Sequence, residues 1–329
     1  MKIVKNIFDE IIAPETLFTA WNEFKRGKRR RPDVMLFERN LEEHIFDLHR
    51  ALVEKSYRHA PYHGFVVNDP KSREIHKATV RDRVVHHALF LVLNPLFEKT
   101  FIYDAYSCRQ NKGTHRGIER LRWAVRRVSR NDRVHCLILK CDIRKFFASV
   151  DHDILLTILA QHIHDADTMW LLHTLIKSFA PGIPIGNLTS QLFANIYMHP
   201  FDQFVKQVLR IPYYIRYTDD FVLVGNNEAQ LWQWLGVLRQ FLTDNLHLTL
   251  HPNKVTLRKY HHGVDFLGYV QRPSHRALRA TTRRRMVKKI TAGVPEHALH
   301  SYLGVLSHAD EKRLARHIKH LFWLTSSYQ

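Results

Sequence analysis

Two adjacent aspartates interrupt one strongly β-prone stretch of the chain, YIRYTDDFVLVG at residues 214–225. The flanking runs are rich in β-branched and aromatic residues, which predicts two strands joined by a turn at Thr-Asp-Asp. Asp219 and Asp220 should then both be exposed at the tip of a hairpin. Neighbouring like charges are costly unless a cation lies near them, but a lone Asp-Asp pair is more commonly a solvated turn. Other parts of the sequence have to decide between these two interpretations.

A third carboxylate follows another apolar run. Residues 134–142 (VHCLILKCD) are typical of a buried strand, and that strand ends in Asp142. If the strands are neighbours, Asp142 joins Asp219 and Asp220, and three such carboxylates are the minimum for holding two Mg²⁺ ions against a nucleoside triphosphate. One ion lowers the pKa of a primer 3′ hydroxyl and the other neutralises the leaving pyrophosphate. Catalysis would then consist of positioning and charge neutralisation, without a covalent intermediate.

The net charge indicates a polyanionic partner. Among 329 residues, 50 Lys and Arg stand against 31 Asp and Glu, which gives +19. No basic amphipathic helix carries the aromatic apolar face that favours membranes, so we expect nucleic acid and no membrane. We also expect a cytoplasmic protein, because no apolar run approaches ~18 residues and acids interrupt the first residues where a signal peptide would be apolar. The three cysteines and 24 histidines lack the spacing of a zinc site.

Basic and glycine-containing segments suggest where a nucleotide would bind. Lys71, Arg73 and Arg81 surround a predicted strand-to-helix transition, which suits a triphosphate or a template backbone, although a solvated face explains each of them equally well. In the loop at residues 181–191, PGIPIGNLTSQ, Gly186 allows a close approach of the backbone to a ligand, and Gln191 lies where a helix begins.

Helical periodicity predicts the remaining elements. One amphipathic helix should cover residues 34–55, and another around residues 118–128 has a face of arginines. That face comprises Arg116, Arg120, Arg122, Arg126, Arg127 and Arg130. From residue 272 onward, twelve Lys and Arg stand against three acids on two or three predicted helices, at 282–290, 297–306 and 311–324. A basic helical segment of this kind suits the holding of a nucleic-acid duplex.

Four motifs in order, DIRKFF with Asp142, GIPIGNLTSQ, YTDD and FLGY, make the chain resemble a reverse transcriptase over roughly residues 69–268. The resemblance implies an α/β (α+β) right-hand polymerase, with fingers, a palm of antiparallel sheet and helices, and a small helical thumb. We expect a basic extension with the start of the fingers at 1–68, fingers at 69–133, palm at 134–268 and a basic helical thumb at 269–329.

The resemblance also implies roles for individual residues. Asp142, Asp219 and Asp220 would be catalytic and, with the backbone carbonyl of Ile143, would bind two Mg²⁺ ions, for which Mn²⁺ could substitute. Lys254 resembles the family's lysine after the hairpin, a proton donor to pyrophosphate, although it could equally be a surface lysine. The run Phe266, Leu267 and Gly268 would form the primer grip.

The position five residues after Asp142 distinguishes two kinds of polymerase. RNA-dependent RNA polymerases commonly have a second acid there, which accepts the ribose 2′ hydroxyl, whereas this chain has Phe147. A bulky ring should exclude that hydroxyl and favour dNTPs, which makes Phe147 a sugar gate. Phe146 is assigned to the same dNTP pocket, although a core position suits it as well.

The loop before Gln191 indicates which group of reverse transcriptases the chain resembles. Retron, group II intron and retroviral enzymes usually have Gln-Gly in this loop and end it with Ser-Pro, whereas this chain has Ile185-Gly186 and Ser190-Gln191. This pattern is similar to reverse transcriptases of diversity-generating retroelements, and we expect no room for a maturase, ribonuclease H or endonuclease domain. Those relatives copy a template-repeat RNA with misincorporation opposite adenine, so that the cDNA replaces a variable repeat in a target gene, and they work with a small basic oligomeric accessory protein.

Ile185 offers a physical reason for low fidelity. A Gln at this position can hydrogen-bond around the incoming nucleotide, whereas Ile185 offers only apolar contact, and discrimination by shape alone is weak. Two alternatives remain: a retron-like or defence-associated reverse transcriptase, or an inactive RNA-binding scaffold with a polymerase fold. The three carboxylates argue against the scaffold, and a nearby pair of adenine-substituted repeats in the flanking DNA would identify the diversity-generating type.

Overall fold

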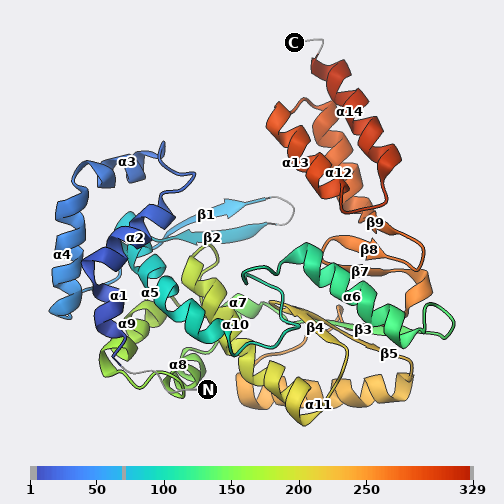
Figure 1. Ribbon diagram of the computed structural model, residues 1–329, viewed down its shortest axis with the longest axis horizontal. Helices are drawn as coiled ribbons and strands as arrows, with labels where there is room; N and C mark the ends of the chain where they lie inside the picture. The colour runs from blue at the N-terminus through green and yellow to red at the C-terminus, as the bar shows by residue number, and fades with distance from the viewer. Residues whose placement is uncertain (1–5, 69–71, 327–329) are drawn as a thin grey trace. The chain divides into compact units, whose positions relative to one another are not determined.

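The computed structural model describes residues 6–68 and 72–326, so Lys71 lies outside the described residues. The chain forms two compact units (Figure 1). Unit 1 contains Met1–Arg109, Ile143–Arg210 and Val237–Leu250, and unit 2 contains Gln110–Asp142, Ile211–Gly236 and His251–Gln329. Each unit is therefore assembled from segments that are distant in sequence.

Short helices surround one long helix in the N-terminal part of unit 1. They are α1 (Phe8–Ile12), α2 (Pro14–Phe24), α3 (Pro32–Arg39) and α4 (Leu41–Val53), and the long helix is α5 (Val80–Glu98). The buried side chains of Leu17, Trp21 and Phe24 lie on α2, which packs on α5. The single helix predicted at residues 34–55 is wrong, because Asn40 has non-helical φ and ψ of −119° and 43° and separates α3 from α4.

The rest of unit 1 holds a ribbon and further helices. Strands β1 (His63–Val67) and β2 (Arg73–Lys77) pair antiparallel. The helices are α7 (Phe146–Ser149), α8 (His152–Ala160), α9 (Ala166–Lys177), α10 (Leu188–Gln203) with a π-helix (Phe204–Val208), and α11 (Glu228–Leu246), which contributes to both units. The side chains of Asp151 and Asp165 cap α8 and α9 by accepting hydrogen bonds from backbone N–H groups of the first turn.

Unit 2 is built around an antiparallel four-stranded sheet in the order β4-β5-β3-β6. The strands are β3 (Leu137–Asp142), β4 (Tyr214–Tyr217), β5 (Asp220–Gly225) and β6 (Thr256–Lys259). Helix α6 (Thr114–Val128) packs on β4 and β5. The apolar runs predicted as strands therefore form the buried centre of the sheet.

A second sheet and three helices complete unit 2. Strands β7 (Val264–Phe266), β8 (Tyr269–Gln271) and β9 (Arg276–Leu278) pair antiparallel. Helices α12 (Ala280–Thr291), α13 (Glu296–Leu306) and α14 (Lys312–Ser326) confirm the three helices predicted after residue 272. Their core contains Met286, Ile290 and Ile318.

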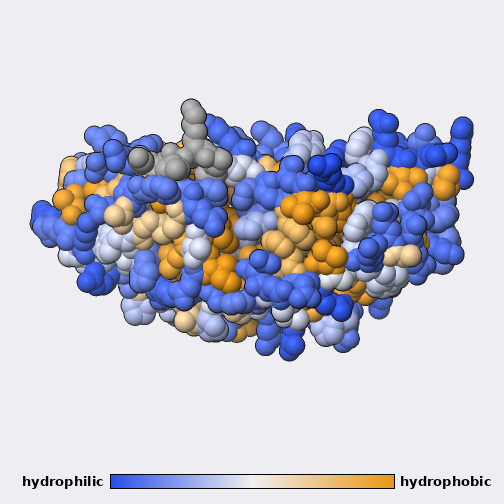
Figure 2. All heavy atoms as spheres, turned by 90° about the horizontal axis from the view of Figure 1, so that it is seen from below, coloured by the Kyte–Doolittle hydropathy of each residue, from blue (hydrophilic) through white to orange (hydrophobic). Residues whose placement is uncertain are grey.

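Figure 2 shows a face on which hydrophilic residues surround patches of hydrophobic ones. Within the described part of the chain, no helix combines the length and apolar character needed to cross a membrane.

Candidate active site

The turn between β4 and β5 carries the paired aspartates. Tyr217 pairs with Asp220, so Thr218, which has φ of 53°, and Asp219 form a two-residue turn. Asp220 is the first residue of β5 and its side chain is only 19% exposed. The expectation that both carboxylates are exposed at the tip is therefore wrong: Asp219 and Asp220 are each only partly exposed, and strand pairing extends to the end of β5 and includes Asp220.

Strand register brings the predicted carboxylates together. Asp142 at the end of β3 lies directly opposite Asp220 on β5, and directly opposed residues point to the same face of a sheet. On the other side of β3, Lys140 pairs with Thr256. Continuing this register by two residues places Lys254 opposite Asp142, so the aspartate at the strand end lies between a carboxylate and an ammonium group.

Two lysines pair with these carboxylates. Lys254 Nζ lies 2.7 Å from Asp142 Oδ1, and Lys140 Nζ lies 3.1 Å from Asp220 Oδ2. Sequence reasoning missed Lys140, although its position two residues before Asp142 on a strand places both side chains on one face. Lys140 therefore belongs to the charged centre of the site.

The pKa of Asp220 is strongly perturbed. The pKa of Asp220 is raised to about 6, chiefly by burial; Lys140 opposes the shift, and repulsion from Asp142 and Asp219 adds to it. Within the residues described here, the Oδ1 atom of Asp220 is buried and has no hydrogen-bond partner. An unpartnered buried carboxylate oxygen beside two more carboxylates suits a hard divalent cation.

Lys254 and Lys140 balance the negative charge of Asp142 and Asp220 in this structure. In the described part of the chain, no three His, Cys, Asp or Glu side chains converge into a complete metal site, and Asp142 and Asp220 are each paired with an ammonium group instead. The donor set fits Mg²⁺ chemically through the free Oδ1 of Asp220, and binding would require the ammonium groups to give up part of their contact.

A buried arginine supports the turn, and sequence reasoning missed it too. Arg216 on β4 is fully buried, and its Nη1 donates to the backbone oxygen of Thr218 at 3.1 Å. The only signal in the sequence is one cation within the apolar run PYYIRY. Because Thr218 precedes Asp219, Arg216 fixes the backbone that presents this carboxylate.

The segment predicted as the primer grip is a tight hairpin. Phe266 pairs with Tyr269, so Leu267 and Gly268 form a two-residue turn with φ of 51° and 90°, as type I′ turns require. Lys140 Nζ donates to the backbone oxygen of Asp265 at 3.0 Å. Through Lys140, the hairpin is connected to Asp220.

In unit 1, one loop links the predicted sugar gate to the predicted fidelity residue. The N–H of Ile183 donates to Phe147 O at 2.8 Å, and the N–H of His76 on β2 donates to Ile185 O at 3.0 Å. Phe146 is buried in the core, whereas Phe147 is partly exposed. Backbone hydrogen bonds therefore hold the loop between Phe147 and β2.

Two glycines make this close packing possible. At Gly182, which has φ of +72°, a Cβ atom would lie 2.1 Å from Phe147 O. At Gly186, which has φ of +118°, it would lie 2.8 Å from Ile75 Cγ2 on β2. The close approach that Gly186 allows is thus to the protein's own strand.

The residues predicted to contact the nucleotide differ in their exposure and in their contacts. Arg73 is exposed on β2, and the guanidinium of Arg81 on α5 lies 4.9 Å from the ring centroid of Tyr57. Gln191 is exposed in the first turn of α10.

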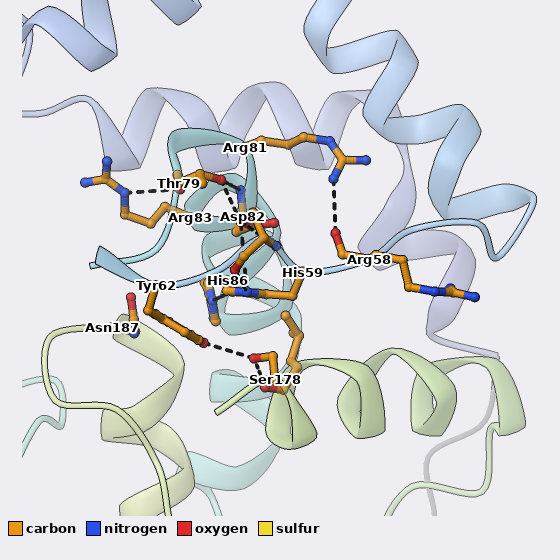
Figure 3. A network of polar contacts seen from close by, with 12 residues as sticks. Arg58, His59, Tyr62, Thr79, Arg81, Asp82, Arg83, His86, Ser178 and Asn187 are labelled. Atoms are coloured by element: carbon orange, nitrogen blue, oxygen red, sulfur yellow. Dashed lines mark hydrogen bonds and ion pairs between the residues drawn. The ribbon is translucent and has the colours of Figure 1, made fainter. Parts of the chain in front are cut away.

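A buried polar chain joins the start of α10 to α5. Figure 3 labels two of its members, His59 and His86. His59 Nδ1 lies 2.6 Å from Ala60 O, which can only accept, so Nδ1 carries the proton. His59 Nε2 then accepts from His86 Nε2 at 3.2 Å, and His86 Nδ1 accepts from the Thr189 hydroxyl at 2.6 Å. Burial lowers the pKa of His86 to about 3, so the ring is neutral.

The carboxylate of Asp82 anchors the same region (Figure 3). It accepts hydrogen bonds from Tyr57 Oη at 2.8 Å, Thr79 Oγ1 at 2.6 Å and Ala60 N at 3.2 Å. Thr189, held by this network through His86, is two residues before Gln191. The participants are scattered along the chain, so no local sequence pattern indicates them.

Comparison with known proteins identifies the family. Residues 68–271 match the family model of reverse transcriptase (RNA-dependent DNA polymerase), and this match covers more than half of the chain. The chain belongs to the reverse transcriptase family.

Individual relatives agree with this assignment. The chain is 25% identical over 255 residues to Protein YkfC of Escherichia coli, and this match covers 65% of each chain. It is 20% identical over 303 residues to the group II intron-encoded protein LtrA of Lactococcus lactis, and this match covers 69% of this chain and 49% of LtrA. It thus spans about two thirds and about half of the length of these relatives.

A solved structure supports the fold. Telomerase from Candida albicans, solved in complex with a fragment of telomeric RNA, has a TM-score of 0.52 and 12% identity, covering 84% of this chain and 58% of that chain. The mixed helix and sheet structure is consistent with the right-hand polymerase fold expected from the sequence.

Proposed function

We propose that the chain is an RNA-directed DNA polymerase, a nucleotidyltransferase that adds dNTPs to a primer on an RNA template. The observation that carries this proposal is the register of β3 and β5, which sets Asp142 opposite Asp220 and leaves Asp219 in the adjoining turn. Family membership supports the same reaction.

The three aspartates, with the Ile143 carbonyl, would hold two Mg²⁺ ions, or Mn²⁺ in their place. When bound, the ions activate the primer 3′ hydroxyl and neutralise the leaving pyrophosphate. Lys254, whose ammonium lies 2.7 Å from Asp142, would donate a proton to pyrophosphate. Lys140 compensates the charge of the buried Asp220.

Nucleotide selection is the second part of the proposal. The partly exposed ring of Phe147 would exclude a ribose 2′ hydroxyl, and Ile185 would contact the nucleotide without hydrogen bonds. Lys71, Arg73, Arg81, Phe146, Gly186 and Gln191 complete the proposed dNTP pocket, and Phe266, Leu267 and Gly268 the primer grip. We assign the fingers, palm and thumb to the residue ranges expected from the sequence.

The loop at Ile185-Gly186 and Ser190-Gln191 supports a specific role in a diversity-generating retroelement. There the enzyme would copy a template-repeat RNA with misincorporation opposite adenine and hold the RNA–cDNA duplex. A small basic accessory protein would assist, and RNA would bridge the two because basic proteins repel each other.

Primer extension on an RNA template with Mg²⁺ tests the catalytic assignment. Asp219→Asn should abolish incorporation, whereas Asp153→Asn, which changes an aspartate whose side chain is 83% exposed on α8, should not. Equal incorporation by wild type and Asp219→Asn would reject the assignment.

Sequencing cDNA from an adenine-rich template tests the role in diversification. Wild type should misincorporate opposite adenine, and Ile185→Gln should reduce these errors. Accurate copying by the wild type, assayed with the accessory protein present, would favour the retron-like or defence-associated alternative.

A further inference from the structure

The outward face of α6 carries a line of arginines with a tryptophan in its middle. Arg116, Arg120, Trp123 and Arg127 follow one another at spacings of four, three and four residues, which places them on one side of a helix. The buried residues of α6 are Gly117, Ile118, Leu121, Ala124 and Val125. The helix thus packs on β4 and β5 with its apolar side and keeps the arginine line at the surface.

Trp123 forms the centre of a stacking surface. Trp123 is 41% exposed, and the guanidinium of Arg120 lies 3.9 Å from its ring centroid. The guanidinium of Arg127 lies 5.7 Å from the same ring, and the Tyr213 ring lies 5.9 Å away. We call Arg116, Arg120, Trp123, Arg127 and Tyr213 the α6 platform. The platform offers aromatic ring faces beside positively charged groups. A ligand that carries both aromatic rings and negative charge can bind to both.

The charge around the platform favours a polyanion. Residues 114–133 contain seven arginines and two acids. One of these acids, Glu119, is bound by Arg276 at 2.6 Å, so it does not neutralise the arginine line. A basic protein partner would be repelled by this surface.

The exposed ring of Trp123 favours a single-stranded nucleic acid over a duplex. A duplex presents phosphates, but its bases are stacked on one another and cannot stack on a side chain of the protein. An unpaired base can stack on Trp123 while the flanking phosphates contact arginines, and this arrangement is typical of single-strand binding.

We propose that the α6 platform binds single-stranded RNA, with one base stacked on Trp123 and the neighbouring phosphates bound by Arg116, Arg120 and Arg127. This site goes beyond the proposed polymerase function, because it uses none of the residues assigned to catalysis or to the dNTP pocket. It gives the chain a means of holding template RNA that has not yet been copied.

Fluorescence anisotropy of the full chain with a labelled oligouridylate RNA of about 12 nucleotides, in EDTA and without dNTPs, tests the proposal. Trp123→Ala should weaken binding about tenfold with an unchanged salt dependence, and Trp123→Phe should restore most of the affinity. The double variant Arg120→Gln, Arg127→Gln should reduce the slope of log affinity against log salt by about 1.4.

Two controls make the result specific. Trp232→Ala changes a tryptophan that is 44% exposed on α11 of the same unit, beside Glu228, and should bind RNA as the wild type does. An abasic oligomer of the same length should bind wild type more weakly than oligouridylate does, and Trp123→Ala should remove this difference.

Unchanged affinity in Trp123→Ala, equal loss in Trp232→Ala, or equally tight binding of the abasic oligomer would overturn the proposal. So would an acidic polypeptide that competes as well as the RNA. Asp220→Asn should bind RNA normally, so loss of polymerase activity in that variant leaves this test intact and separates the two proposals.

Discussion

Replacing Asp220 with Asn should make the metal-free protein more stable while abolishing its activity. The pKa of Asp220 is raised from its ordinary 3.8 to about 6, chiefly by burial. An acid whose pKa is higher in the folded state contributes stability that is fully present below its unfolded pKa and is lost as the pH rises through its folded pKa. The pKa difference corresponds to about 3 kcal/mol, so in the absence of metal the ionised Asp220 costs up to this amount at pH 8.

Asn preserves the size of the side chain and an oxygen that can accept from Lys140, whose ammonium lies 3.1 Å from Asp220 Oδ2. In EDTA, Asp220→Asn should therefore exceed wild type in free energy of unfolding by up to about 3 kcal/mol at pH 8 and by only about 0.5 kcal/mol at pH 4. Incorporation of dNTPs should fall by at least about 100-fold, because an anionic ligand is lost.

Urea unfolding at pH 4, 6 and 8, in EDTA and in Mg²⁺, provides the measurement. Mg²⁺ should stabilise the wild type at pH 8 and stabilise Asp220→Asn much less, because binding to the folded state alone raises stability. Asp153→Asn, at an aspartate whose side chain is 83% exposed, should show no comparable pH-dependent gain. A variant less stable than wild type at pH 8, or a stability difference that does not change with pH, would refute this reasoning.

Three further predictions concern the same site and the loop in unit 1. Mg²⁺ affinity, measured by calorimetry, should fall as the pH drops through about 6, because protons compete for Asp220; a flat profile between pH 5 and 8 would contradict this. Gly182→Ala should lower the free energy of unfolding by at least about 3 kcal/mol, because the new Cβ would lie 2.1 Å from Phe147 O. The control Gly236→Ala, whose Cβ would have nothing within 4 Å, should stabilise α11 by about 0.5–1 kcal/mol. Thr189→Val should cost about 1–3 kcal/mol by leaving buried His86 Nδ1 without its donor, and Thr189→Ser should not; equal stability of both variants would show that the hydroxyl contributes nothing.

Periodicity and strand propensity were sufficient to predict the elements that carry the carboxylates. The apolar run ending in Asp142 and the runs flanking Asp219 are strands, as predicted. These elements are long or strongly patterned, so local preference and packing favour the same structure.

Features that depend on register or on distant partners could not be predicted. The sequence does not say that Asp220 lies opposite Asp142, and this pairing is what buries its carboxylate and brings Lys140 to it. The contact between His86 and Thr189 joins positions 103 residues apart, and neither residue has a local signature. Asn40 breaks a helix whose apolar periodicity continues across it.

RNA-templated dNTP incorporation by wild type and Asp142→Asn is the most direct test of the site at β3 and β5. Asp142 lies opposite Asp220 in the sheet, and its carboxylate contacts the ammonium group of Lys254. Wild type should extend an RNA-annealed primer in Mg²⁺, and Asp142→Asn should bind the same primer and template without extending it. Extension by Asp142→Asn at the wild-type rate would contradict the account.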